Sequence, residues 1–267
     1  MKRSLLLVVL ILLVGSTMLL AQVTEDDVLI VPKTSVAPFI DGELDTAVWH
    51  YVGETLAIVM NADDAEEPYD WFDLFGSFRM MYDDEFLYLW LQVQDDIINA
   101  EGGNHEYDGV ELYFDANYSQ TEGAFDGEDD LQMRFNVGEE TIDLVDVGYG
   151  GGTDWGFIKD GIDFVILDNG VDGWQLEAAI PLFDLQLEPD LEFGFDLQIN
   201  DADESTRENM YRWWANDNNE WKDASLFGTA KLTSSRVIND QWLEVPKGSA
   251  PTIDGAMAAG EWADAVC

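Results

Sequence analysis

Residues 87–94 read Leu87-Tyr88-Leu89-Trp90-Leu91-Gln92-Val93-Gln94, so aliphatic side chains alternate with aromatic or polar ones. Successive side chains of a β-strand point to opposite faces, so a period of two indicates a half-buried strand. The same alternation recurs in residues 110–115, 131–137 and 193–200. Turn-forming residues separate these segments, as at Tyr82-Asp83-Asp84-Glu85. The pattern predicts an all-β fold, an antiparallel β-sandwich with a jelly-roll-like or immunoglobulin-like two-sheet architecture.

The first residues have the pattern of an export signal. Lys2 and Arg3 precede an unbroken apolar run from Leu5 to Val14, and Gly15, Ser16 and Thr17 follow before Met18-Leu19-Leu20-Ala21. This predicts a signal peptide over residues 1–21, and therefore an exported protein that is extracellular, at the cell surface or periplasmic in a bacterium. An uncleaved membrane anchor is the alternative, because the apolar run nearly reaches spanning length. After cleavage we expect no membrane insertion.

The chain is strongly acidic, with 55 Asp and Glu against 12 Lys and Arg and a net charge of −43. Such a field repels nucleic acid and anionic lipid, so neither is an expected partner. It suits neutral ligands or divalent cations. The single cysteine, Cys267, excludes a disulfide framework.

One motif occurs twice, and its spacing predicts the domain organisation. Residues 37–42 read Ala-Pro-Phe-Ile-Asp-Gly and are followed by Trp49, while residues 250–255 read Ala-Pro-Thr-Ile-Asp-Gly and are followed by Trp262. The offset is 213 for the aspartates (254 − 41) and for the tryptophans (262 − 49). We therefore predict one domain over residues 24–235, a connector over 236–248 and the truncated start of a second similar domain over 249–267. Further modules of the same polypeptide are the expected covalent partners.

The non-aliphatic side of the predicted strands has the chemistry that a sugar requires. It carries amides, carboxylates, an arginine and aromatic rings: Gln92, Gln94, Glu111, Arg134, Asp196, Gln198 and Asn200, with Tyr88, Trp90 and Tyr113. Sugar hydroxyls donate and accept hydrogen bonds together, and the apolar face of a pyranose stacks on an aromatic ring. The alternative is an ordinary polar sheet face with Arg134 in a salt bridge.

Of the 10 tryptophans, Trp221 is the candidate ligand platform. It lies in the polar segment 216–223, where we expect an exposed loop without a packing partner for the indole. Trp49, Trp90 and Trp174 lie in or beside apolar patterns and are expected in the core.

A series of short motifs, in order, covers essentially the whole predicted domain. They are Ile40-Asp41-Gly42 with Trp49, Tyr82 to Tyr88, Val93-Gln94-Asp95, Asp108 to Asp115, Gln132 to Asn136, Gly173-Trp174 with Glu177 to Ile180, Gly194 to Asp201, Asn219 to Asp223, and Phe227-Gly228. The ordered set resembles carbohydrate-binding module family 9, which is found appended to bacterial xylanases and other secreted polysaccharide-degrading proteins. The resemblance implies a β-sandwich that holds the reducing-end sugar of a glucan or xylan between two aromatic rings, with structural calcium.

The resemblance also implies roles for particular residues. Trp221 matches one of the two sandwiching tryptophans, and Glu111, Arg134 and Gln198 match hydrogen-bonding positions. The second tryptophan would fall just before Asp108, where the sequence reads Asn104-His105-Glu106-Tyr107. His105 or Tyr107 is therefore the expected smaller replacement ring. Weaker affinity, a different glycan and loss of sugar binding all stay open.

Calcium is the expected cofactor, in a structural role. It requires six to eight oxygen ligands that converge from several segments. The sequence candidates are Asp95, Asp96, Asp108 and the acidic loop 126–130, of which we predict Asp95 and Asp108 as ligands.

The predicted function is non-catalytic binding of the ends of neutral β-glucan or xylan chains, as a module of a secreted or cell-surface protein of polysaccharide breakdown. Catalysis is not predicted, because His50 and His105 are the only histidines and no Ser/His/Asp or multi-His cluster occurs. One alternative is a structural or adhesive surface module. Another is a haem-binding redox sandwich, in which His105 would pair with a methionine. The methionine candidates are Met60, Met80, Met81, Met133 and Met210.

Overall fold

A computed structural model describes residues 28–50, 52–59, 71–99, 105–137, 141–145, 160–204 and 206–236. The predicted signal peptide and the start of the second copy lie outside these residues, as does the connector apart from its first residue. Within the described ranges, no helix is both long and apolar enough to cross a membrane.

The described chain consists mainly of strands. They are β1 (Val28–Lys33), β2 (Thr55–Ala57), β3 (Leu74–Tyr82), β4 (Phe86–Asp95), β5 (Gly109–Asp115), β6 (Asp130–Asn136), β7 (Thr141–Val145), β8 (Asp163–Asp168), β9 (Trp174–Pro181), β10 (Glu192–Asp201), β11 (Asn209–Arg212) and β12 (Gly228–Arg236). The helical elements are short: α1 (Thr46–Trp49) and the 3₁₀ turns η1 (Gly170–Asp172), η2 (Glu220–Lys222) and η3 (Ala224–Leu226).

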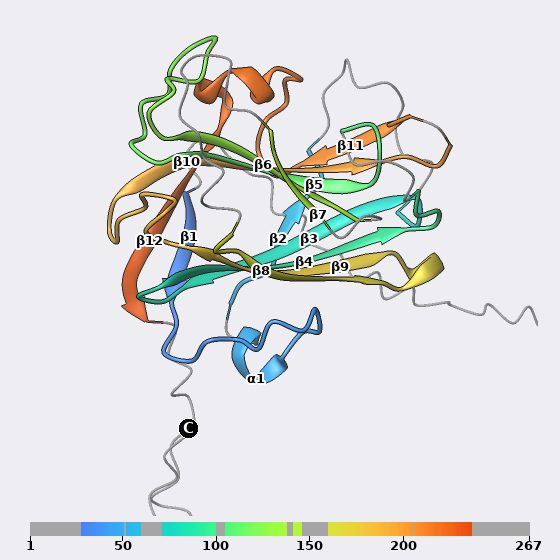
Figure 1. The fold of residues 1–267 in the computed structure, drawn as a ribbon, viewed down its shortest axis with the longest axis horizontal. Coiled ribbons are helices and arrows are strands. Elements are labelled where there is room, and N and C mark those ends of the chain that lie inside the picture. The colour runs from blue at the N-terminus through green and yellow to red at the C-terminus, as the bar shows by residue number, and fades with distance from the viewer. Residues whose placement is uncertain are drawn as a thin grey trace, which may run out of the picture.

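The strands form two layers that face each other (Figure 1). One layer has the order β7-β6-β5-β10-β12, with β11 also paired to β10; the other has the order β3-β4-β9-β8, with β2 paired to β3. The all-β sandwich prediction is confirmed. Two details differ from it, because β1 links the layers by pairing with both β12 and β3, and both of these pairings are parallel. The sandwich is therefore one curled sheet, closed along one side by the first and last strands.

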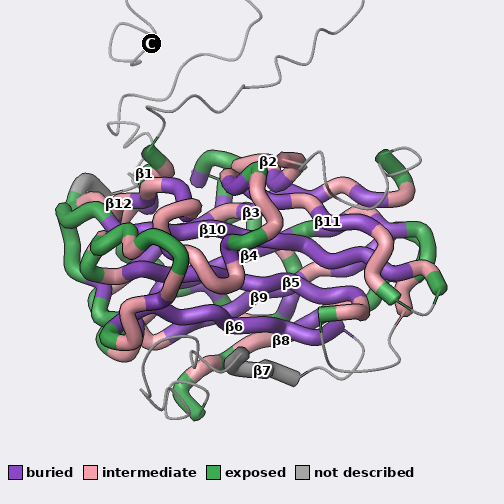
Figure 2. The backbone as a smooth tube through the Cα atoms, turned by 90° about the horizontal axis from the view of Figure 1, so that it is seen from above, coloured by how far each residue is buried: buried purple, intermediate pink, exposed green. Residues whose placement is uncertain are grey.

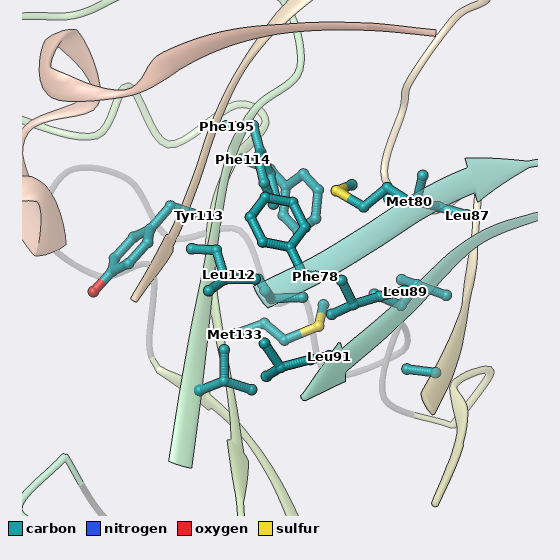
Figure 3. Close-up of a cluster of buried hydrophobic side chains, with 14 of the residues drawn as sticks. Phe78, Met80, Leu87, Leu89, Leu91, Leu112, Tyr113, Phe114, Met133 and Phe195 are labelled. Carbon is teal, nitrogen blue, oxygen red and sulfur yellow. The ribbon is translucent and has the colours of Figure 1, made fainter. Parts of the chain in front are cut away.

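The aliphatic side of each alternating strand faces the space between the layers. In Figure 3, Phe78, Leu89 and Leu91 of one layer lie against Leu112 and Met133 of the other, and all five are at most 1% exposed. Figure 2 shows the strands of both layers largely buried along their length. Complete burial of a side chain of this size stabilises the fold by roughly 1.5–3 kcal/mol. This core keeps the outward-facing side chains of both layers at fixed positions.

The outer face of the β3-β4-β9 layer is covered by the segment around α1. Trp49 and Val52 pack there against Met81, Tyr88 and Trp90 in a second buried cluster. The prediction that Trp49, Trp90 and Trp174 are core residues is confirmed. The prediction that one polar face unites all the strands is wrong: β4 belongs to the opposite layer from β5, β6 and β10, so Tyr88, Trp90, Gln92 and Gln94 do not share their surface.

A buried carboxylate explains the Ile40-Asp41-Gly42…Trp49 motif. Glu177 of β9 accepts the Trp49 indole N–H at 2.9 Å and the backbone N–H groups of Asp41 and Gly42 at 3.1 Å each. Burial raises the pKa of Glu177, and these three donors offset part of the rise. The first copy of the motif thus has a structural role, as the cover of one sheet face.

Candidate functional site

A row of charged and polar side chains crosses the outer face of the other layer. Arg134 of β6 is directly opposite Glu111 of β5, Glu111 is opposite Gln198 of β10, and Gln198 is opposite Arg212 of β11. The four side chains are at most 6% exposed. Directly opposite residues lie within contact distance across a sheet, so strand register alone aligns these groups.

Glu111 is the centre of the row. Its Oε1 accepts Arg134 Nε at 3.2 Å and Asn200 Nδ2 at 2.8 Å, and its Oε2 accepts the Tyr113 hydroxyl at 2.9 Å and Gln132 Nε2. Burial alone would raise the pKa of Glu111, but Arg134 and the hydrogen bonds from Asn200 and Tyr113 together lower it below its ordinary value. Glu111 is therefore held as a carboxylate.

Arg212 joins the row to the loop that precedes η2. Its fully buried guanidinium donates from Nε to Gln198 Oε1 at 2.9 Å and to Glu220 Oε1 at 2.6 Å, and from Nη2 to Asn218 Oδ1 at 3.0 Å. Burial raises the pKa of Glu220, and Arg212 counteracts this rise. The pair positions the residue that follows, Trp221.

Trp221 lies in η2 and is partly buried, not freely exposed. Its turn is closed by backbone hydrogen bonds from Lys222 to Asn219 and from Asp223 to Glu220. The ring packs against the edge of the main core, and Lys222 Nζ is 5.0 Å from its centroid. The predicted lack of a packing partner is wrong, because the loop folds back onto the sheet through Arg212. A ring held in this way is a more rigid platform than one in a free loop.

These groups enclose a pocket of about 440 Å³, within the usual size range of small-ligand sites. Its lining residues are His105, Glu111, Tyr113, Gln132, Arg134, Gln198, Arg207, Asn218, Glu220 and Trp221. Five of the six predicted ligand-binding residues are therefore together. The exception is Tyr107, which is half-buried and does not line the pocket. His105 lies at the pocket with its Nε2 at 2.8 Å from Glu106 Oε1, and both side chains are exposed.

Sequence reasoning missed four of the lining residues: Gln132, Arg207, Asn218 and Glu220. Gln132 precedes Arg134 by two positions and so shares its face, which means that strand periodicity could have found it. The other three lie outside the regular part of any strand. Only the folded arrangement brings them to the pocket.

Three buried aspartates form a cluster where β4 and β10 end and β5 begins. Asp95, Asp108 and Asp201 each offer a carboxylate oxygen within 4.8 Å of the others. Burial raises the pKa of each to about 8. Asp95 Oδ2 and Asp201 Oδ1 have no hydrogen-bond partner among the described residues. A bound cation would satisfy these oxygens and remove the cost of burying several carboxylates together, so the donor set fits calcium.

The sequence found two members of this Asp95 cluster and missed Asp201. Two backbone N–H groups also hold the Asp108 carboxylate in place. Its Oδ1 accepts the Ala202 N–H at 2.7 Å, and its Oδ2 accepts the Asn99 N–H. Two more groups of aspartates are present: Asp115 with Asp129 and Asp130, and, adjoining the Asp95 cluster, Asp73 with Asp96 and Asp203. The candidate loop 126–130 contributes to the first and Asp96 to the second.

The methionine candidates of the haem alternative lie in several places, and the sulfur of the buried Met210 accepts a hydrogen bond from Arg212 Nη2 at 3.4 Å. Met80 and Met133 are buried in the core between the layers, and Met81 lies in the cluster under α1. Met60 lies outside the described residues. The described lining of the pocket at His105 contains no methionine.

A comparison with protein families agrees with this geometry. The family model described as "Carbohydrate family 9 binding domain-like" matches residues 40–235. The chain belongs to this family. As a family 9 domain it is similar over 200 residues, at 32% identity, to the exoglucanase XynX of Acetivibrio thermocellus, and over 199 residues, at 30% identity, to endo-1,4-beta-xylanase A of Thermotoga maritima.

These alignments cover 73% of this chain but only 16% and 17% of the two relatives. This family 9 domain thus spans about one sixth of their length. Among solved structures, it is similar to a carbohydrate binding module family 9 from Caldicellulosiruptor kristjanssonii in complex with cellotriose. The TM-score is 0.62 at 25% identity, with 79% of this chain and 95% of that chain covered.

Proposed function

We propose that this domain binds the end of a β-glucan or xylan chain in the pocket between Trp221 and the Glu111 row, without catalysing any reaction on it. The observation that carries the proposal is the convergence of a fixed indole with a hydrogen-bonded carboxylate, guanidinium and amide in one cavity. A sugar ring would stack on the indole while its hydroxyls exchange hydrogen bonds with these groups. The solved relative in complex with cellotriose supports the same class of ligand.

The two carboxylates of the pocket are poorly suited to hydrolysis. A retaining or inverting glycosidase needs one carboxyl group that can give up a proton and another that is free to act as base or nucleophile. Glu111 and Glu220 are each bound to an arginine and at most 2% exposed. Both groups are committed to holding the pocket together, which favours binding over chemistry.

Calorimetric titration of the chain with cellobiose and with xylobiose tests the proposal. We expect saturable heat with at least one of them, and we expect Trp221→Ala to abolish most of it. Trp71→Ala is the matched control, because Trp71 is 61% exposed and does not line the pocket. No heat with either sugar, in protein that circular dichroism shows to be folded, would leave a structural or adhesive role as the remaining interpretation.

We also propose that the Asp95 cluster holds a structural calcium ion. The ion would tie together the end of β4, the start of β5 and the end of β10, since one ligand comes from each place. Removal by a chelator should lower the melting temperature by roughly 5–10 °C, as expected for loss of a ligand present at about 100 times its Kd. An unchanged melting temperature, in protein that metal analysis shows to hold calcium before chelation and none after it, would contradict a structural ion; protein that takes up no calcium from a saturating solution would contradict the site.

Export and modularity complete the proposal. Residues 1–21 would direct the chain out of a bacterial cell and be removed, and the domain would act beside other modules of its polypeptide. The family and the xylanase relatives support both export and a polypeptide with several modules. Intact-mass analysis of protein expressed from residue 1 in a bacterial host should find a mature chain that begins at Gln22; retention of the first 21 residues would contradict it.

A further inference from the structure

Basic side chains are concentrated at the pocket although the chain is poor in them. Of 12 Lys and Arg residues in a protein with a net charge of −43, two line the pocket and two more contact residues that line it. They are Arg134, Arg207, Arg212 and Lys222. A neutral sugar does not require this concentration, because amides and carboxylates satisfy hydroxyl groups equally well.

The charges in the pocket do not cancel. Glu111 forms an ion pair with Arg134, and Glu220 forms one with Arg212. The third arginine at the pocket, Arg207, belongs to neither pair. No carboxylate of the described residues forms an ion pair with Arg207.

Arg207 is held at the edge of the polar row. Its Nη1 donates to Asn200 Oδ1 at 3.1 Å, and Asn200 Nδ2 in turn donates to Glu111 Oε1 at 2.8 Å. A guanidinium has five N–H donors in a planar fork, and only one of those of Arg207 is used in this contact. The half-buried side chain lines the cavity, and its contact with Asn200 fixes one end of the guanidinium there. Such a fork binds a carboxylate through two parallel hydrogen bonds, with more energy and stricter geometry than a hydroxyl allows.

We infer that the sugar in this pocket carries a carboxylate, as a uronic acid unit does, and that Arg207 binds this carboxylate. The inference rests on the proposed function, since it assigns the acidic group to a sugar bound at Trp221 and Glu111. The acidic surface does not forbid such a ligand. At physiological salt, exposed charges more than about 8 Å away are largely screened, whereas Arg207 would be in direct contact.

The test compares three monosaccharides by titration of the whole chain at neutral pH: glucose, glucuronic acid and the methyl ester of glucuronic acid. The ester has nearly the shape of the acid without its charge, and cellobiose serves as the positive control for sugar binding. We expect glucuronate to bind at least about 10-fold more tightly than its ester, as for one charge-assisted bidentate contact. In Arg207→Gln this ratio should fall to near one. Arg79→Gln should leave the ratio unchanged, because it removes the same charge from β3 in the opposite layer.

The outcomes separate the two proposals. Binding of cellobiose or glucose with no preference for glucuronate over its ester would overturn the acidic-sugar inference and leave the proposed function standing. A preference that survives Arg207→Gln, in a variant with wild-type melting temperature, would overturn the assignment to Arg207. Absence of binding by all of these sugars and by xylobiose would overturn the proposed function and this inference with it.

Discussion

Replacing Glu111 by Gln is the most demanding single test of the site, because this side chain is 2% exposed and accepts four hydrogen bonds. Gln has almost the same volume but only one acceptor oxygen, and its amide group donates. In Glu111→Gln, two of the four donors would therefore lose their acceptor. Depending on the amide orientation, these are Arg134 and Asn200 or Tyr113 and Gln132.

The expected cost follows from this arrangement. Each lost hydrogen bond to a charged acceptor contributes about 1.5–3 kcal/mol, and removing one partner of a buried ion pair costs about 3–5 kcal/mol because the other charge stays buried. Arg134 is only 6% exposed, so it cannot recover full hydration. These overlapping costs give a decrease of about 3–4 kcal/mol in the free energy of unfolding. For a domain of this size, that is a melting temperature lower by roughly 6–16 °C.

Denaturant titration followed by tryptophan fluorescence measures this change, with Glu122→Gln as the control on an exposed glutamate that makes none of these contacts. We expect the control to lie within about 0.5 kcal/mol of the wild type. A decrease below about 1 kcal/mol for Glu111→Gln would refute the reasoning, since it would mean that the row is hydrated or that Arg134 has an alternative acceptor.

Three further predictions concern the rest of the fold. Gly173→Ala should destabilise the domain by more than about 3 kcal/mol, because φ is +82° and an added Cβ would lie 2.0 Å from Val93 O; a melting curve like the wild type would contradict this. Trp49→Phe should cost about 2–4 kcal/mol in denaturant titration by leaving Glu177 without its indole donor, and equal stability would show that the contact is dispensable. Asp201→Asn should reduce the calcium-dependent thermal shift by at least half, with the exposed Asp172→Asn as control; a full shift in Asp201→Asn would exclude Asp201 as a ligand.

Local periodicity was sufficient to predict the all-β sandwich and three of the residues that line the pocket. Glu111, Arg134 and Gln198 follow from the alternation of side chains within single strands, which requires no knowledge of neighbours. Periodicity cannot assign a strand to a layer, so Trp90 and Gln92 were placed on the same face as Glu111. The parallel pairing of β1 with β12 likewise depends on two segments about 200 residues apart.

The residues that sequence analysis missed reach their sites only through contacts between segments far apart in the chain. Asp201 lies beside Asp108 because β10 pairs with β5, and Asp95 reaches them from β4 in the other layer. With 55 acidic residues, no local pattern marks Asp201 out. Arg207 has no periodic context, since it lies in the loop between β10 and β11. The half-buried state of Trp221 depends on an arginine nine residues earlier that binds the neighbouring glutamate.

A crystal structure of the chain soaked with cellobiose tests the central claim most directly. The account predicts a sugar ring stacked on Trp221, with hydroxyl groups in hydrogen-bond distance of Arg134, Glu111 or Gln198. Sugar density on another surface, with this pocket filled only by water, would contradict it.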